Sequence, residues 1–92
     1  MAVYVDALGW NGWKLYGQAV KSCHLMADSK PELIAFATKL GLRHSWVQGL
    51  NDYGRVPHFD LVQSKRTRAL ELGALTISGR ELISLMDRIR NR

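Results

Sequence analysis

The sequence is poor in cysteine and proline, and it has no long apolar run. Its one cysteine, Cys23, excludes an internal disulfide and any zinc cluster built on several cysteines. No stretch approaches the roughly 20 apolar residues that a membrane helix needs. Residues 1–6 hold neither a charged segment nor a long apolar one, so no signal peptide is expected. We therefore expect a cytoplasmic protein without a membrane partner.

Acidic residues are also in short supply. The chain has 13 Lys and Arg against 8 Asp and Glu, a formal net charge of +5, which favours anionic partners without choosing between polymers and small molecules. Its 92 residues allow one domain, 1–92, and a hydrophobic fraction of 47% is typical of a folded chain. Because the core of such a small domain is limited, a homo-oligomer would be a natural source of further burial.

Segments rich in β-formers alternate with segments of helical pattern. Strands are expected at 2–6, 22–26, 45–48 and 74–77, and helices at 30–40, at 64–72 and from 79 onward. Residues 7–21 form a glycine-punctuated aromatic loop, in part a hairpin, and 49–57 form another loop. The order predicts an α/β fold: a small single-layer sheet of about four short strands packed by two to three helices, with Rossmann-like βα alternation.

Local signals mark the helix ends. Ser29 with Glu32, and Ser78 with Glu81, have the spacing of capping boxes. Ser64 is expected to cap the middle helix. Gly41 and Gly73 are expected to end the first and second helices. The last helix should bury one apolar face, made of Leu82, Ile83, Leu85, Met86 and Ile89.

Residues 58–73 carry an unusual charge pattern. We interpret 58–63 as a polar loop that leads into the helix, whose first turn would hold Lys65, Arg66 and Arg68. A helix N-terminus has partial positive charge and normally favours acidic residues. The cations are therefore either solvated surface charges or part of a preformed site for phosphate or another anion.

Polar residues also follow the expected strands. If the sheet is largely parallel, ligands should bind beyond the carboxyl ends of its strands. The residues that would meet at such a rim, or supply aromatic stacking to it, are Asp6, Trp13, His24, Asp28, Trp46, Gln48, His58, Asp60, Lys65 and Arg66. His24 could instead be a structural histidine bonded to Asp28. Cys23 is expected to be a buried strand residue rather than a nucleophile.

Several ordered motifs resemble one protein family. They are the segments 1–6, 23–29, 32–37, 40–42, 46–48, 58–61, 64–66 and 72–74. Together they are similar to the domain of unknown function 4031, a family of bacterial and phage or prophage proteins. The resemblance implies an α/β fold and a polar constellation, not a mechanism. Two features depart from the family pattern: Ile34 stands where the family often has histidine, and 9–22 is longer and more aromatic.

These residues support four functional hypotheses. The first is a non-enzymatic binding module for a phosphorylated or nucleotide-like ligand, without cofactor or catalytic residue; a phage protein of this kind would sequester a host signalling nucleotide in the host cytoplasm. The second is a phosphoesterase or nuclease with a divalent metal held by His24, His58 and Asp60. The third is a nucleic-acid binder and the fourth is a protein inhibitor.

Overall fold

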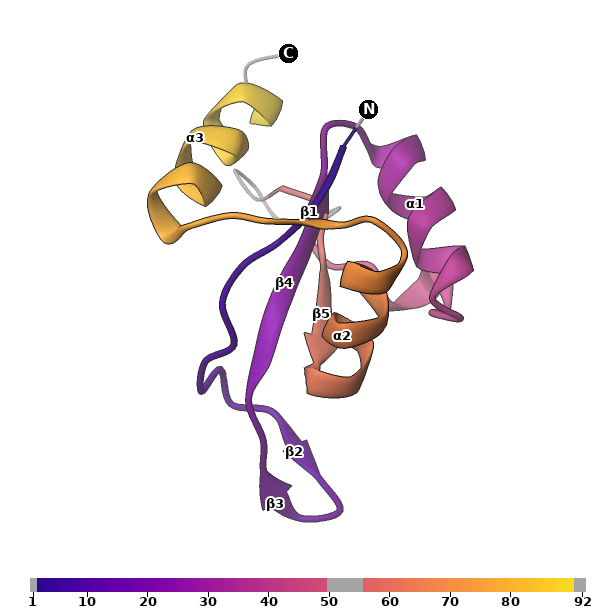
Figure 1. Ribbon diagram of the computed structural model, residues 1–92, viewed down its shortest axis with the longest axis vertical. Helices are drawn as coiled ribbons and strands as arrows, with labels where there is room; N and C mark the ends of the chain where they lie inside the picture. The colour runs from indigo at the N-terminus through magenta and orange to yellow at the C-terminus, as the bar shows by residue number, and fades with distance from the viewer. Residues whose placement is uncertain (1, 50–55, 91–92) are drawn as a thin grey trace.

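The computed structural model describes residues 2–49 and 56–90, which form a mixed four-stranded sheet, a small hairpin and three α-helices. The sheet contains β1 (Val3–Val5), β4 (Ser22–Ala27), β5 (Phe59–Val62) and β6 (Leu75–Thr76), in the order β5-β4-β1-β6. The hairpin consists of β2 (Lys14–Leu15) and β3 (Gln18–Ala19) and projects from one end of the sheet (Figure 1). This architecture confirms the α/β class.

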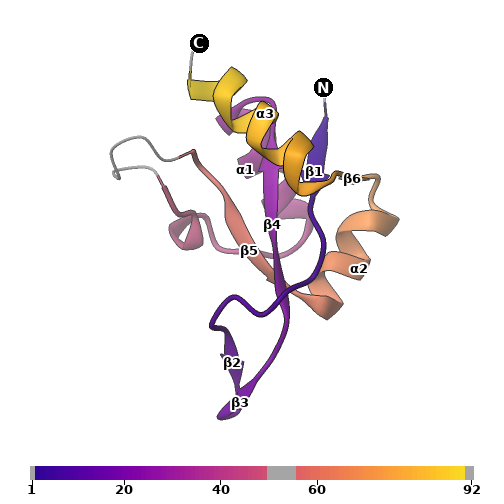
Figure 2. The ribbon, with the colours of Figure 1, turned by 90° about the vertical axis from the view of Figure 1, so that its left-hand side faces the viewer.

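The helices lie on both faces of the sheet. α1 (Lys30–Lys39) and α2 (Gln63–Glu71) cover one face, and α3 (Gly79–Arg90) lies across the other (Figures 1 and 2). A 3₁₀ turn, η1 (His44–Trp46), follows α1. No helix in the described part of the chain is long and apolar enough to cross a membrane.

Strand alternation sorts the buried residues of β4 into two clusters. Cys23, Leu25 and Ala27 pack with residues of α1 and α2 in the larger cluster. Met26, with its side chain on the opposite face, packs with Leu85 of α3 in the smaller one. α3 covers only part of its face, so the start of β4 stays outside this second cluster.

The local helix signals are largely confirmed. The Ser29 hydroxyl accepts a hydrogen bond from the Glu32 backbone N–H at the start of α1. At α3 both arms of the capping box form, because the Ser78 N–H donates to Glu81 Oε1 and the Glu81 N–H donates to Ser78 Oγ. Gly41 and Gly73 adopt positive φ angles of 77° and 105° where α1 and α2 end.

The interpretation of 58–63 as a polar loop is wrong. Residues 59–62 are strand β5, which alternates buried Phe59 and Leu61 with half-buried Asp60 and Val62. Because β5 leads directly into α2, the helix begins at Gln63 after Val62, and Ser64 does not cap it. A four-residue strand with one polar face resembles a loop in composition, and only its period of two identifies it.

Three further expectations need correction. β4 runs antiparallel to both β1 and β5, so the sheet is not largely parallel. Residues 45–48 form no strand: Ser45 and Trp46 belong to η1, and Gln48 makes only an isolated bridge to His58. Ile83 of α3 is 62% exposed and lies outside the apolar face. Most of the predicted loop 49–57 lies outside the described residues.

A matched pair of serine substitutions tests the helix boundaries. Ser29→Ala should lower the free energy of unfolding by about 1 kcal/mol, because it removes a side-chain cap. Ser64→Ala should change it by less than about 0.5 kcal/mol, because Ser64 is an exposed residue inside α2. Urea unfolding of both variants measures the difference. Equal losses would contradict the boundary of α2.

Candidate functional site

A row of polar side chains crosses the sheet on the face that α3 partly covers. His24 of β4 lies directly opposite Asp60 of β5, and the register that pairs Val5 with Leu25 places Asp6 opposite His24 on the other side. All three alternate with residues of the larger core, so they share one face. His58, two residues before Asp60, belongs to the same face. Three strands therefore bring four of the predicted site residues together.

Asp6 and His24 are joined by two hydrogen bonds. The His24 backbone N–H donates to Asp6 Oδ1 over 2.6 Å, and His24 Nδ1 lies 2.7 Å from Asp6 Oδ2. The side-chain bond raises the pKa of His24 above its usual value, against the opposing effect of burial. Burial would raise the pKa of Asp6, but the bonds from His24 outweigh it and the pKa is lowered. The pair therefore favours carboxylate and imidazolium together.

The backbone of Asp6 is held from the other side of the sheet. Arg66 Nε of α2 donates to the Asp6 carbonyl oxygen over 2.9 Å. Neighbouring Cys23 is 1% exposed, and burial raises the pKa of its thiol to about 12. A thiol in this state is neither ionised nor accessible, so Cys23 is a core residue, as expected.

His58 is oriented by the backbone rather than by a carboxylate. Its Nδ1 lies 2.8 Å from the Val56 carbonyl oxygen, and its Nε2 is 3.9 Å from Asp60 Oδ1. The rings of His24 and His58 meet edge to face, with centroids 5.6 Å apart. A carboxylate and a carbonyl oxygen can only accept, so Nδ1 carries the proton in both rings. In the neutral form each ring therefore keeps an unprotonated Nε2.

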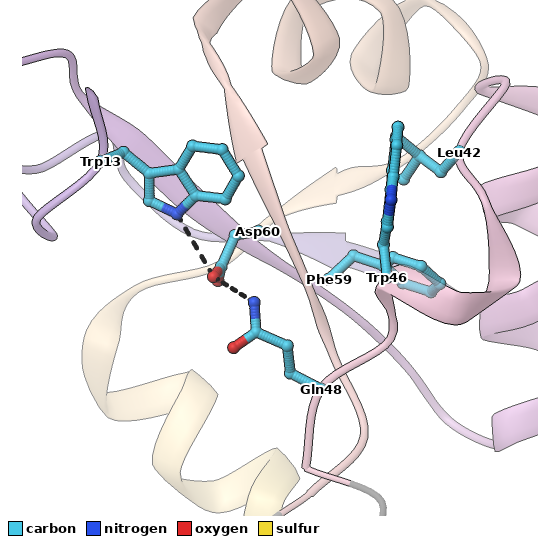
Figure 3. A pocket seen from close by; sticks show the side chains of 6 residues that line it. All are labelled: Trp13, Leu42, Trp46, Gln48, Phe59 and Asp60. Carbon is cyan, nitrogen blue, oxygen red and sulfur yellow. Dashed lines mark hydrogen bonds between the residues drawn. The ribbon is translucent and has the colours of Figure 1, made fainter. Parts of the chain in front are cut away.

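A pocket of about 350 Å³ opens beside this row, and Figure 3 shows its lining. The Asp60 carboxylate is fixed at the pocket wall, because its Oδ2 accepts from Gln48 Nε2 over 2.7 Å and from Trp13 Nε1 over 3.3 Å. The indoles of Trp13 and Trp46 stand on either side of Asp60, and Phe59 lies next to Trp46 (Figure 3). The lining residues are Trp13, Leu42, Trp46, Gln48, Phe59 and Asp60.

Six predicted site residues do not line the pocket: Asp6, His24 and His58 belong to the row beside it, and Asp28, Lys65 and Arg66 lie outside both. Asp28 sits beyond the far end of β4, where it accepts a hydrogen bond from the Tyr4 hydroxyl over 3.0 Å. The alternative that Asp28 binds His24 is therefore wrong. Lys65 Nζ donates to the Leu40 carbonyl at the C-terminal end of α1, a favourable place for a cation. Arg66 supports Asp6 from behind, as described above.

Sequence reasoning missed two wall residues and one orienting group. Leu42 and Phe59 line the pocket although both also belong to the larger core. The Val56 carbonyl that orients His58 carries no sequence signal, because every residue has a carbonyl group. The alternation of 59–62 could have placed Phe59 in a strand beside Asp60.

A metal centre is not preformed in the part of the chain that the structure describes. Within residues 2–49 and 56–90, no three His, Cys, Asp or Glu side chains are arranged to hold a metal ion. His24, His58 and Asp60 are neighbours, and each ring is bonded through Nδ1 to an acceptor, which leaves Nε2 of both rings available.

Residues 3–89 match the family model described as Protein of unknown function (DUF4031). The chain belongs to this family. The membership confirms the resemblance seen in the motifs, and the Asp6, His24 and Asp60 row lies within the matched range. No curated protein and no solved structure matches the chain significantly.

The Asp6–His24 bond predicts a pH window of stability for this DUF4031 protein. A lowered Asp6 pKa stabilises the fold above about pH 3.9, its unfolded value, and this contribution is lost as the pH falls through the folded pKa. A raised His24 pKa stabilises the fold below about pH 6.5 and is lost as the pH rises through the folded pKa. The bond should therefore contribute most between about pH 4 and 6.5.

Asp6→Asn should lower the free energy of unfolding by only about 1 kcal/mol inside that window, because the partly exposed pair is screened by solvent. The loss should be smaller on either side of the window, where one partner of the pair is uncharged. Urea unfolding across the pH range measures the difference. Glu71→Gln is the control, because the pair of Glu71 with Arg68 is exposed and its loss should cost little at any pH. A pH-independent loss in Asp6→Asn would contradict the assignment.

Proposed function

We propose that the protein binds a nucleotide-like small ligand, with the base held in the pocket between Trp13 and Trp46. The observation that carries this proposal is the combination of aromatic walls with a fixed hydrogen-bonding pair, Asp60 and Gln48. Small-molecule sites are typically apolar hollows with a few placed polar groups. Stacking on indole rings suits any base, and the polar pair adds orientation.

The chemistry of the polar pair favours a base with exocyclic donors. Both hydrogen bonds that Asp60 accepts in the pocket end on Oδ2, and a carboxylate has about four acceptor sites, so Oδ1 can take an amino group. Gln48 donates through Nε2 and keeps its amide oxygen as an acceptor. Adenine, guanine and cytosine carry amino groups that match these acceptors.

The charge of the chain supports an anionic ligand in a general way. A net charge of +5 attracts anions toward the protein before binding. Lys65 and Arg66 already donate to backbone carbonyls, and neither lines the pocket. The proposal therefore rests on the base pocket rather than on the start of α2. Sequestration of a signalling nucleotide, by a phage-encoded protein or otherwise, would need only this pocket.

Calorimetric titration with nucleoside monophosphates and cyclic nucleotides, in the presence of EDTA, tests the proposal. Trp13→Ala and Trp46→Ala should each weaken binding about 5- to 100-fold, because stacking contributes about 1–3 kcal/mol per base. Trp10→Ala is the matched control: Trp10 is 69% exposed and lies outside this pocket, and its loss should change affinity less than about twofold.

Failure of every nucleotide to bind would contradict the proposal. Equal losses in Trp10→Ala and Trp13→Ala would also contradict it, since the pocket would then have no special part in binding. A macromolecular partner, either a nucleic acid or an inhibited protein, would become the better hypothesis.

A further inference from the structure

Two imidazoles lie side by side next to the base pocket, and they are held differently. His24 is bonded through Nδ1 to the carboxylate of Asp6, which stabilises its protonated form. His58 is bonded through Nδ1 to the neutral carbonyl of Val56. Their ring centroids are 5.6 Å apart. Asp60, which neighbours both rings, also lines the pocket. An acid and a base with distinct partners are thus placed within reach of one substrate group.

We infer that His24 and His58 form a metal-independent acid–base pair that cleaves a ribonucleotide phosphodiester whose base occupies the Trp13–Trp46 pocket. The inference rests on the proposed function, because the pocket would supply the position of the substrate. It adds turnover to binding. The class of substrate is a nucleotide with a 2′-hydroxyl beside a phosphodiester, as in RNA or a short oligoribonucleotide.

The reaction balances without an added reagent. His58 Nε2 takes the proton of the 2′-hydroxyl while the 2′-oxygen forms a bond to phosphorus. The bond from phosphorus to the 5′-oxygen breaks, and protonated His24 gives its Nε2 proton to that leaving oxygen. The products are a 2′,3′-cyclic phosphate and a free 5′-hydroxyl. Water then returns the proton from His58 to His24.

The surroundings of the pair agree with these roles. His24 is faced by Asp6, which follows β1, by His58, which precedes β5, and by Asp60 of β5. Arg66 of α2 holds the Asp6 backbone. Asp6 is a positioning residue, because it touches His24 and not the substrate. The proposed step itself uses only the two imidazoles.

The test uses the full chain with ribodinucleotides and their 2′-deoxy counterparts, in EDTA, with products identified by mass spectrometry. The deoxy compounds cannot be cleaved by this route, so they measure binding alone. His24→Asn and His58→Asn are the informative variants, because the asparagine amide can keep the Nδ1 hydrogen bond but lacks Nε2. Each should lower kcat/KM by about 100-fold or more and leave deoxy binding unchanged.

Two further variants sharpen the assignment. His44→Gln should retain activity, since His44 binds Thr38 through Nε2 and lies outside the pair. Wild-type activity should fall along an alkaline limb, as the pH rises through the folded pKa of His24, because the acid must carry its proton. Asp6→Asn should move the alkaline limb of this profile to lower pH, a shift that a merely structural role would not produce.

The outcomes separate the inference from the proposed function. Cyclic phosphate formed in EDTA and lost in both asparagine variants supports the inference. If the 2′-deoxy dinucleotides bind but the ribodinucleotides are not cleaved, the inference is overturned and the pocket only binds its ligand. Cleavage only after addition of a divalent metal also overturns it. Failure of both dinucleotides to bind also overturns the inference, whereas the proposed function is overturned only if the mononucleotides and cyclic nucleotides fail to bind as well.

Discussion

The double hydrogen bond between Asp6 and His24 is the interaction on which the site depends. It forms where β1 and β4 run antiparallel, because Asp6, the residue after Val5, lies opposite His24 of β4. Removing the carboxylate would leave the imidazole without its anionic partner. The bond also distinguishes the two histidines: it raises the pKa of His24, while its neighbour His58 is held by a neutral carbonyl.

Both faces of the sheet contribute to this arrangement. The core of α1 and α2 fixes the strands from one side, and Arg66 reaches from α2 to the Asp6 carbonyl. On the other face α3 covers Met26 and its neighbours but ends short of His24. The uncovered part of that face lies beside the hairpin, which brings Trp13 to Asp60. An aromatic pocket and a pair of histidines therefore lie around one carboxylate, that of Asp60, as the proposed binding and cleavage of one ligand require.

Sequence reasoning was most successful where the signal is local. The Ser29 and Ser78 caps, the two glycine stops and the strand around Cys23 depend on residues a few positions apart. Strand direction depends on pairing between distant segments, and the condition of a largely parallel sheet is not met here. Because β4 is antiparallel to its neighbours, its first residues lie at the end of the sheet that also holds Asp6 and Asp60. Asp28 lies at the opposite end. The cations of α2 suggested an anion site, but two of them, Lys65 and Arg66, donate hydrogen bonds to backbone carbonyl groups.

The most direct measurement of this account is the tautomer of each histidine, read by ¹⁵N NMR above the pKa of the rings. We expect Nδ1–H tautomers for His24 and His58. His44 is an internal reference: the Thr38 hydroxyl donates its only proton to the Ile34 carbonyl, so His44 Nε2 must donate to Thr38 and carry the hydrogen. Nδ1–H signals for His24 and His58 with an Nε2–H signal for His44 would support the paired site. An Nε2–H tautomer at His24 or His58 would contradict it.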